Sequence, residues 1–152
     1  MTITNSSPTT ASYSLPNAKP GDSASRCFTV TYNGSLPATV KFYRSALSGN
    51  TGLESDTDLV IQKGTGSATD CSDFVAAGTG GSIYSGTLSA MNTSYATGYS
   101  VLNRAASATW TNVGPNNVVT FKIQATLNAS TPSADQGKTT GTHSFTWEAQ
   151  NN

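Results

Sequence analysis

The stretch VTFKIQATL, residues 119–127, decides the fold of this chain. An apolar side chain recurs at every second position, and the residues between are Thr, Lys or Gln. The apolar set is Val119, Phe121, Ile123, Ala125 and Leu127. Successive side chains of a β-strand point to opposite faces of its sheet, so this pattern predicts a strand with one buried face. Strands buried on both faces carry continuous apolar runs instead, which favours an antiparallel sheet here.

The same alternation recurs in shorter runs along the chain. The clearest runs are residues 26–32, 38–43, 58–63 and 143–149. Clusters of Gly, Pro, Asn, Asp and Ser separate them and are typical of turns. We therefore predict an all-β fold in which two antiparallel sheets pack face to face as a sandwich, formed by a single domain over residues 1–152.

Two segments are harder to interpret. Helical periodicity is nearly absent, and its best candidate is residues 70–77, one or two turns at most. Residues 89–111 suggest a long crossover with one further strand. The in-strand alternation predicts one core, made of Phe28, Val30, Val40, Phe42, Phe121, Ile123, Phe145 and Trp147.

The charge content excludes several classes of partner. Only 11% of the 152 residues are charged, and 8 basic residues cancel 8 acidic ones. Without a basic cluster, a nucleic-acid partner is not expected. No apolar run approaches the length of a membrane span. The start, Met1 to Asn5, lacks the features of a signal peptide, which favours a chain whose N-terminal part has been trimmed.

The two cysteines, Cys27 and Cys71, are predicted to form a disulfide. They lie too far apart in sequence for a redox pair, and no neighbouring residues complete a metal site. A structural disulfide is typical of an exported protein. On the chain-entropy model it stabilises the fold by about 4 kcal/mol. We expect Cys27 on the strand face opposite Phe28, within reach of a loop that carries Cys71.

No residue pattern predicts catalysis, a cofactor or a transition metal. His143 is the only histidine, and it lies in a strand pattern. Two interpretations of Asp56, Asp58, Asp70 and Asp73 stay open, as calcium ligands or as solvated turn carboxylates. We favour the second, and we do not expect an enzyme.

Two strand lysines, Lys41 and Lys122, allow an isopeptide bond in principle. That bond requires a lysine buried beside an acid. The alternation places both lysines opposite apolar neighbours, so we expect them to point outward. Glu148 flanks the inward Trp147 and is expected on the outer face as well.

The order of motifs resembles that of the TasA/camelysin family of bacterial surface and biofilm-matrix proteins, especially its shorter actinobacterial relatives. The motifs are LPNAKPGDSASRCFTVTYNGSLPATVKFY at 15–43, SGTLSAM at 85–91, VVTFKIQATLNASTPSADQG at 118–137 and HSFTWEAQNN at 143–152. The match covers roughly residues 2–150. Each motif alone is common in β-sandwich sequences. The order and spacing of all the motifs together are more specific to this family.

The resemblance implies a jelly-roll sandwich that is secreted to the extracellular matrix or cell surface and self-associates into fibres. In such fibres an N-terminal strand of one subunit completes a sheet of the next. Thr2, Ile3 and Thr4 look like the end of the strand that follows the donor segment in relatives, and we predict that they form the assembly edge. The donor itself would then precede Thr2, and this chain alone would assemble poorly.

Rival functions remain. A carbohydrate-binding or adhesion module would use exposed aromatic residues such as Tyr43, Tyr95 and Tyr99 as its platform. A virion or tail decoration protein would share the composition. A clustered aromatic face would favour the binding module.

Overall fold

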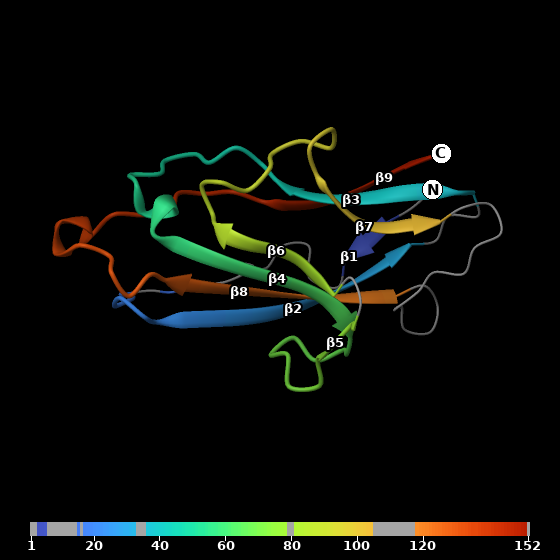
Figure 1. The fold of residues 1–152 in the computed structure, drawn as a ribbon, viewed down its shortest axis with the longest axis horizontal. Coiled ribbons are helices and arrows are strands. Elements are labelled where there is room, and N and C mark those ends of the chain that lie inside the picture. Colours follow the sequence, from blue (N-terminus) through green and yellow to red (C-terminus); the bar gives the residue numbers. More distant parts are fainter. Residues whose placement is uncertain are drawn as a thin grey trace.

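The computed structural model describes residues 3–5, 15, 17–32, 36–78, 81–104 and 118–151. They form two antiparallel sheets that pack as a sandwich (Figure 1). Sheet A contains β1 (Ile3–Asn5), β2 (Ser23–Tyr32), β8 (Val118–Leu127), β4 (Thr57–Thr65), β5 (Val75–Ala76) and β6 (Ser82–Thr87). Sheet B contains β7 (Tyr99–Arg104), β3 (Ala38–Arg44) and β9 (Phe145–Asn151). The predicted all-β, two-sheet antiparallel architecture is confirmed, whereas the jelly-roll path stays a prediction.

Strand β8, which contains the stretch that decides the fold, lies in the middle of sheet A. It pairs with β2 on one side and with β4 on the other. The register aligns Phe121 with Phe28 and Ile123 with Ile61, so that apolar residues of three adjacent strands share the inner face. Strand β1 extends this sheet beyond β2, while β5 and β6 both pair with the far side of β4.

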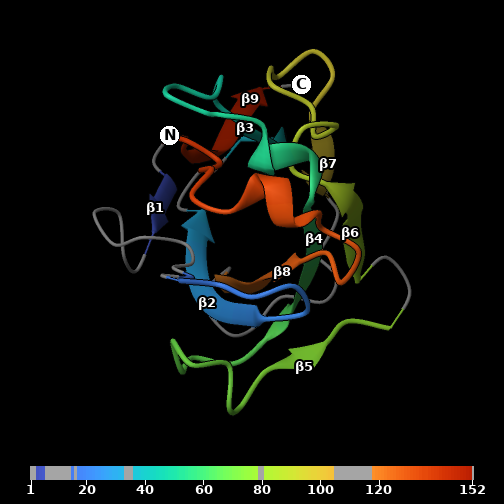
Figure 2. The same ribbon diagram turned by 90° about the vertical axis from the view of Figure 1, so that its left-hand side faces the viewer.

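Sheet B is smaller, with β3 between its two neighbours. Strand β9 pairs with β3 in unbroken register from Ala38 opposite Asn151 to Arg44 opposite Phe145. Strand β7 pairs with the other side of β3 through a register shift after Val40. Across the gap between the sheets, β1 lies beside β9 and β6 lies beside β7 (Figure 2).

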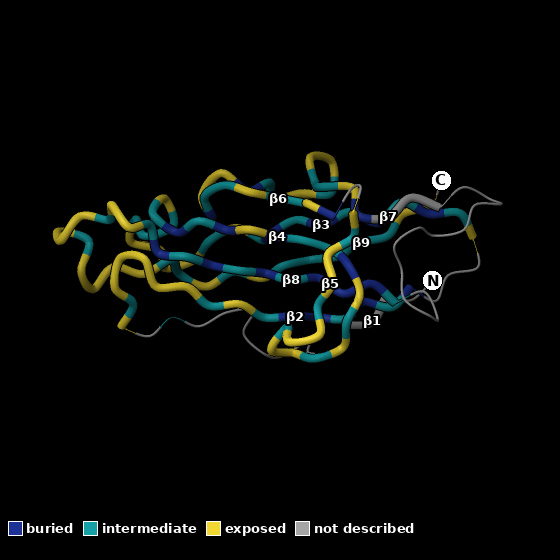
Figure 3. Tube along the Cα trace, turned by 60° about the horizontal axis from the view of Figure 1, so that its bottom comes forward, coloured by how far each residue is buried: buried dark blue, intermediate teal, exposed yellow. Residues whose placement is uncertain are grey.

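The core lies between the sheets, and buried positions alternate along the strands (Figure 3). Six of the eight predicted core residues are buried, namely Phe28, Val30, Val40, Phe42, Phe121 and Ile123. The other two, Phe145 and Trp147, pack against this core but are only partly buried. They belong to β9, and an edge strand has no neighbour to cover its outer side. The predicted strand register is therefore correct.

Phe42 is the centre of the ring contacts. Its ring stacks on Phe121 of sheet A at 6.1 Å and on Phe145 of sheet B at 5.5 Å between centroids. The indole of Trp147 lies 4.9 Å from Phe42 and 5.3 Å from Phe121. These contacts join the two sheets, because each ring reaches across the space between them.

The predictions for residues 70–77 and 89–111 differ in their agreement with the structure. Residues 70–77 contain turns and the short strand β5 but no helix, so the helical candidate is wrong. The loop hydrogen bonds described below explain this, because they satisfy the backbone without a helical turn. The further strand expected within residues 89–111 is β7. Residues 105–111 lie outside the described part of the chain.

Arg44 is the one charged side chain among the buried residues of the described part. Its guanidinium donates hydrogen bonds to the backbone oxygens of Leu88 at 2.9 Å, Ser89 at 3.0 Å and Ser45 at 2.9 Å. A buried charge is costly unless it is hydrogen-bonded. Arg44 therefore fastens the turn after β6 to the end of β3.

Candidate functional site: sheet edges and a tyrosine face

The outer edge of β9 is a regular strand edge along all seven residues of the strand. All seven residues of β9 pair with β3, and no second strand pairs with β9 within the described residues. An unpaired edge presents a row of backbone N–H and C=O groups to any extended segment that approaches it. Phe145, Trp147 and Ala149 face the core from this strand. The edge therefore combines open backbone groups with a firmly packed inner face.

The outer edge of β2 is partly covered. Among the described residues, β1 pairs with Val30 to Tyr32. Further along, the N–H of Cys27 donates to the backbone oxygen of Thr69 at 3.0 Å. In an antiparallel strand the N–H and C=O of one residue point to the same side, so this contact occupies the side of Cys27 that faces away from β8.

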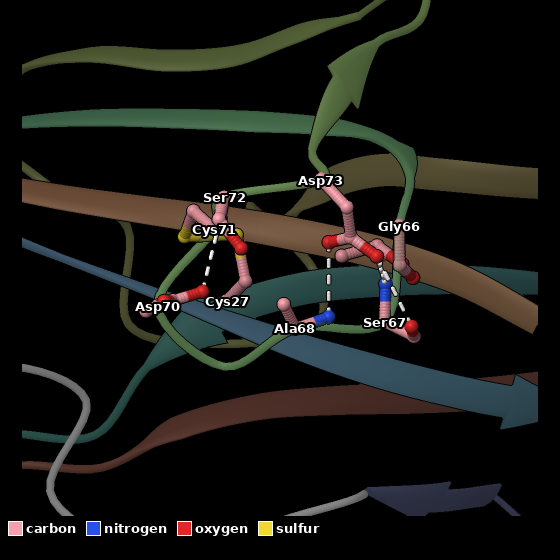
Figure 4. The surroundings of a disulfide bond; sticks show 9 residues. Cys27, Gly66, Ser67, Ala68, Asp70, Cys71, Ser72 and Asp73 are labelled. Atoms are coloured by element: carbon pink, nitrogen blue, oxygen red, sulfur yellow. Dashed lines mark hydrogen bonds between the residues drawn. A yellow bond between two sulfur atoms is a disulfide. The ribbon is translucent and has the colours of Figure 1, made fainter.

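Thr69 reaches β2 because residues 66–74 cross the outer face of sheet A, a segment that we call the clamp loop (Figures 2 and 4). The predicted disulfide between Cys27 and Cys71 is confirmed, and it fastens this loop to β2. Cys27 lies on the face opposite Phe28, as expected, and it is buried because the loop covers it. Thr120 of β8 adds a hydrogen bond from its hydroxyl to the backbone oxygen of Gly66.

Within the clamp loop, the side chain of Asp73 accepts backbone hydrogen bonds that a helix or strand would otherwise provide. Its carboxylate accepts the backbone N–H of Ala68 at 2.9 Å and that of Ser67 at 2.8 Å (Figure 4). These donors, with Ala68 first, lower the pKa of Asp73. Asp70 likewise accepts the N–H of Ser72 at 3.0 Å. Both acids therefore serve as turn caps, which is the interpretation that the sequence favoured.

Close packing at the base of the loop requires glycine. A Cβ on Gly64 would lie 2.0 Å from the backbone oxygen of Val75, where β5 returns beside β4. Gly66 has φ of 137°, a conformation that other residues rarely adopt. The clamp loop consequently leaves and rejoins the sheet at one point, as in a compact Ω-loop.

The outer face of sheet B carries two of the three predicted platform tyrosines. The hydroxyl of Tyr43 donates to Glu148 at 2.5 Å, and Lys41 lies over the Tyr95 ring at 4.9 Å. Lys41 is also the register partner of Glu148, which links the four side chains into one group. We call this group the tyrosine face. Lys41 and Glu148 point outward here, as predicted.

Electrostatics within the tyrosine face are coupled. The hydrogen bond from Tyr43 lowers the pKa of Glu148, and the same bond is the main reason that the pKa of Tyr43 is raised. Burial raises the pKa of Tyr95, with a further contribution from the charge of Glu148. At neutral pH the two phenols are therefore neutral and Glu148 is a carboxylate.

Tyr99 does not belong to this face, so that part of the platform prediction is wrong. Its ring packs against Tyr84 at 5.2 Å and against the core. Residue type alone gave no signal for this difference, because the direction of Tyr99 depends on β7 lying beside β6. Lys122 points outward as predicted, and its ammonium lies 6.0 Å from the ring of Phe74.

A cavity of about 610 Å³ lies at the end of the sandwich where η1 (Leu53–Ser55) and η3 (Ser133–Asp135) are found. Apolar side chains of Leu53 and Leu127 line it together with the ion pair of Lys138 and Asp135. The charges of Lys138 and Asp135 are therefore paired with each other.

His143 packs edge-on against Phe145 at 5.3 Å between ring centroids. Burial is the main cause that lowers its pKa. Within the described residues, no three His, Cys, Asp or Glu side chains gather as metal ligands would. Nor does any helix in that part of the chain have the length and hydropathy that a membrane crossing requires.

The predicted assembly edge is described in part. Ile3 and Thr4 lie in β1 at the edge of sheet A, whereas Thr2 falls outside the described residues. Their role in assembly stays a prediction. A scan against protein-family models and a search of the curated proteins found no match to this chain.

Proposed function

We propose that this chain is a non-catalytic structural subunit of an extracellular fibre or surface layer. An extended N-terminal segment of one copy pairs with the outer edge of β9 in the next copy, as in donor-strand complementation. The observation that carries the proposal is the unbroken seven-residue pairing of β9 with β3 on one side only among the described strands. The resemblance to the TasA/camelysin family supports the same assignment.

Two buried hydrogen-bond donors support this position. The Nε atom of Arg26 and the Nε1 atom of Trp147 are buried and have no acceptor among the described residues. Both side chains contact Phe28, with the Arg26 guanidinium 5.8 Å from the ring centroid and the indole at 6.3 Å. A buried donor without an acceptor costs roughly 1–3 kcal/mol. A strand that enters between β2 and β9 would bring backbone carbonyls to this place.

Charge and covalent structure fit such a subunit. The formal net charge is zero, so stacked copies do not repel one another strongly. The disulfide is typical of a protein that works in an oxidising, extracellular compartment. The added strand would pair through main-chain hydrogen bonds, which form with almost any side chain. A donor segment can therefore have a simple polar sequence.

The test is negative-stain microscopy of the full-length native protein combined with photocrosslinking. A photoreactive residue is introduced at Gln150, which is exposed on β9, and as a matched control at Val75, which is exposed on β5. Fibres with crosslinks from Gln150 and none from Val75 are expected. A protein that stays monomeric at all concentrations would overturn the fibre assignment, and crosslinks only from Val75 would overturn β9 as the acceptor.

A second candidate function is a carbohydrate-binding module, and the tyrosine face is the observation that favours it. Tyr43 and Tyr95 lie with Lys41 and Glu148 on one side of a sheet. Aromatic rings with nearby hydrogen-bonding groups are a common way to bind sugars. Here, however, Lys41 already occupies one side of the Tyr95 ring, which leaves less aromatic surface for a sugar.

Binding to insoluble polysaccharides distinguishes the two candidates. Tyr43→Ala should abolish retention on the polysaccharide if the tyrosine face binds sugar, because it removes a ring and frees Glu148. Val60→Ala changes an exposed apolar residue of sheet A and serves as the control. Equal retention of both variants would remove this candidate.

A further inference from the structure

The two tyrosines of the tyrosine face differ in the acceptor that their hydroxyls contact. The hydroxyl of Tyr43 donates to a carboxylate oxygen of Glu148 at 2.5 Å. The hydroxyl of Tyr95 donates to the backbone oxygen of Thr39 at 3.1 Å. A carboxylate can accept a proton and keep it, whereas a backbone carbonyl is too weak a base to do so. Tyr43 therefore has a base in direct contact with its phenolic proton.

A second hydrogen bond holds the Glu148 carboxylate in place. The side-chain amide of Gln150 donates to its other oxygen at 3.0 Å. The bond from Tyr43, followed by the bond from Gln150, lowers the pKa of Glu148, so this group is a carboxylate at neutral pH. The bond to Glu148 also raises the pKa of Tyr43, so the phenol keeps its proton until an electron is removed.

Oxidation of a phenol is easier when its proton can leave at the same time. Loss of one electron from Tyr43 makes the phenol a strong acid, and its proton moves along the existing hydrogen bond to Glu148. The products are a neutral phenoxyl radical and a neutral carboxylic acid. No positive charge then remains on the ring, and the cost of a charge in a partly buried position is avoided.

Two nearby oxidisable rings are less favourable sites. The Nζ atom of Lys41 lies 4.9 Å from the centroid of the Tyr95 ring, and this cation–π contact is lost when the ring gives up an electron. The Nε1–H of Trp147 is buried and has no acceptor among the described residues. A positive charge on either ring is therefore poorly stabilised. Of these three rings, Tyr43 is the one whose oxidation leaves no charge behind.

We propose that Tyr43 is a site of oxidative phenol coupling, at which its ring forms a carbon–carbon bond to a second phenol in the presence of hydrogen peroxide and a haem peroxidase. Each phenol loses one electron and one proton, and Glu148 takes the proton of Tyr43 and passes it to water. The two radicals join at ring carbons next to the oxygens. The hydrogen on each joined carbon then moves to the phenol oxygen. The two electrons and two protons reduce one peroxide to two waters.

The partner is a phenolic molecule that reaches the outer face of sheet B from solution. Tyr43 is partly exposed on that face, so its radical can be reached without a docked neighbour. The reaction uses a side chain on the face of the sheet and no backbone group of an edge. The inference is therefore independent of fibre assembly at β9. Coupling gives the chain a covalent link to phenolic material around it.

Peptide mapping by mass spectrometry tests the site. The folded, disulfide-bonded protein is treated with N-acetyltyrosine, hydrogen peroxide and a haem peroxidase, and the coupled residues are identified. Tyr43 should carry the adduct, with at least about tenfold less on Tyr95, although both rings are partly exposed. Comparable adducts on Tyr43 and Tyr95, or an adduct on Trp147 in place of Tyr43, would overturn the proposal.

Glu148→Gln separates proton transfer from packing. The amide keeps a hydrogen-bond acceptor for Tyr43 but cannot take its proton, so the Tyr43 adduct should fall at least about tenfold. Tyr95→Phe is the matched control, because it removes a hydroxyl from the same face and leaves the bond between Tyr43 and Glu148. It should not change the Tyr43 adduct. An unchanged adduct in Glu148→Gln, or an equal loss in Tyr95→Phe, would contradict the role of Glu148. The distribution between Tyr43 and Tyr95 in the unsubstituted protein decides the question if a variant fails to fold.

Discussion

The edges of β2 and β9 lie on the same side of the sandwich, yet the chain treats them differently. The β2 edge meets β1 at one end and the Thr69 carbonyl in its middle, with a disulfide beside it. The β9 edge has no partner strand among the described residues. Exposed edges promote association between chains, and proteins commonly cover them. Within the described residues, the β2 edge thus has hydrogen-bond partners along part of its length, whereas no strand pairs with the outer edge of β9.

The strands themselves do not cause this difference. Both β2 and β9 alternate apolar and polar residues, and both pack an aromatic residue, Phe28 or Trp147, into the core. The protection of β2 comes from a loop whose sequence lies between β4 and β5. An edge can therefore be closed by a distant segment without any change in the strand that forms it.

The largest expected loss of stability comes from Phe121→Ala, and Phe145→Ala provides the comparison between the two sheets. Phe121 and Phe145 both stack on Phe42, but Phe121 is fully buried and Phe145 only partly. Phe121→Ala should lower the free energy of unfolding by about 3–5 kcal/mol. Phe145→Ala should cost roughly 1–3 kcal/mol, since less area leaves water on folding. Urea denaturation measures both, and equal costs would mean that the β9 edge is as well covered as sheet A.

Removal of the disulfide should have the next largest effect. The double variant Cys27→Ser with Cys71→Ser should lose about 4 kcal/mol, because the unfolded chain is no longer constrained. Thermal denaturation of the variant beside the oxidised protein measures this loss. The hydrogen exchange of β9 amides should become faster only as far as the lower free energy of unfolding of the whole protein requires. Selective loss of protection in β9 would show that the two edges are not independent.

A pair of glycine substitutions addresses the base of the clamp loop. Gly64→Ala places a Cβ against the Val75 oxygen and should destabilise the protein by about 1–3 kcal/mol. Gly78→Ala meets no atom within 4 Å and is the matched control. It should be neutral or stabilise the fold by about 0.4–1 kcal/mol through the unfolded chain. Similar melting temperatures for both variants would contradict the close approach of β5 to β4.

The smallest effects come from acid, in two separate windows. Burial lowers the pKa of His143 below its ordinary 6.5, so its contribution to stability is complete above that pH and is lost as the pH falls through it toward the lowered pKa. The hydrogen bonds from Ala68 and Ser67 lower the pKa of Asp73 below 3.8, so its contribution is lost only as the pH falls below that value.

The two pH ranges separate the response of His143, next to β9, from that of Asp73 in the clamp loop. Urea denaturation between pH 7.5 and 5.5 should show a decline that His143→Gln abolishes. The amide resonance of Ala68 should shift only below about pH 3.8, and Asp73→Asn should remove that shift. A shift of Ala68 in the His143 window would show that the clamp loop and the start of β9 are coupled.

The sequence predicted those features that depend on local alternation. Period-two patterns identified the main strands, the inward faces of β2, β3 and β8, and the outward direction of Lys41 and Lys122. The phase of Cys27 against Phe28 also placed the cysteine on the outer face. These predictions succeed because a strand fixes the side of each residue through its neighbours in the chain.

What only the tertiary structure decided concerns contacts between distant segments. The Thr69 cap on Cys27, the three carbonyls around Arg44 and the packing of Tyr99 on Tyr84 all join residues that no local pattern connects. The position of β9 at the end of its sheet is of the same kind. Alternation determines which face of a strand is buried, but the order of strands in a sheet determines which edge has a neighbour, and that order depends on the packing of the whole chain.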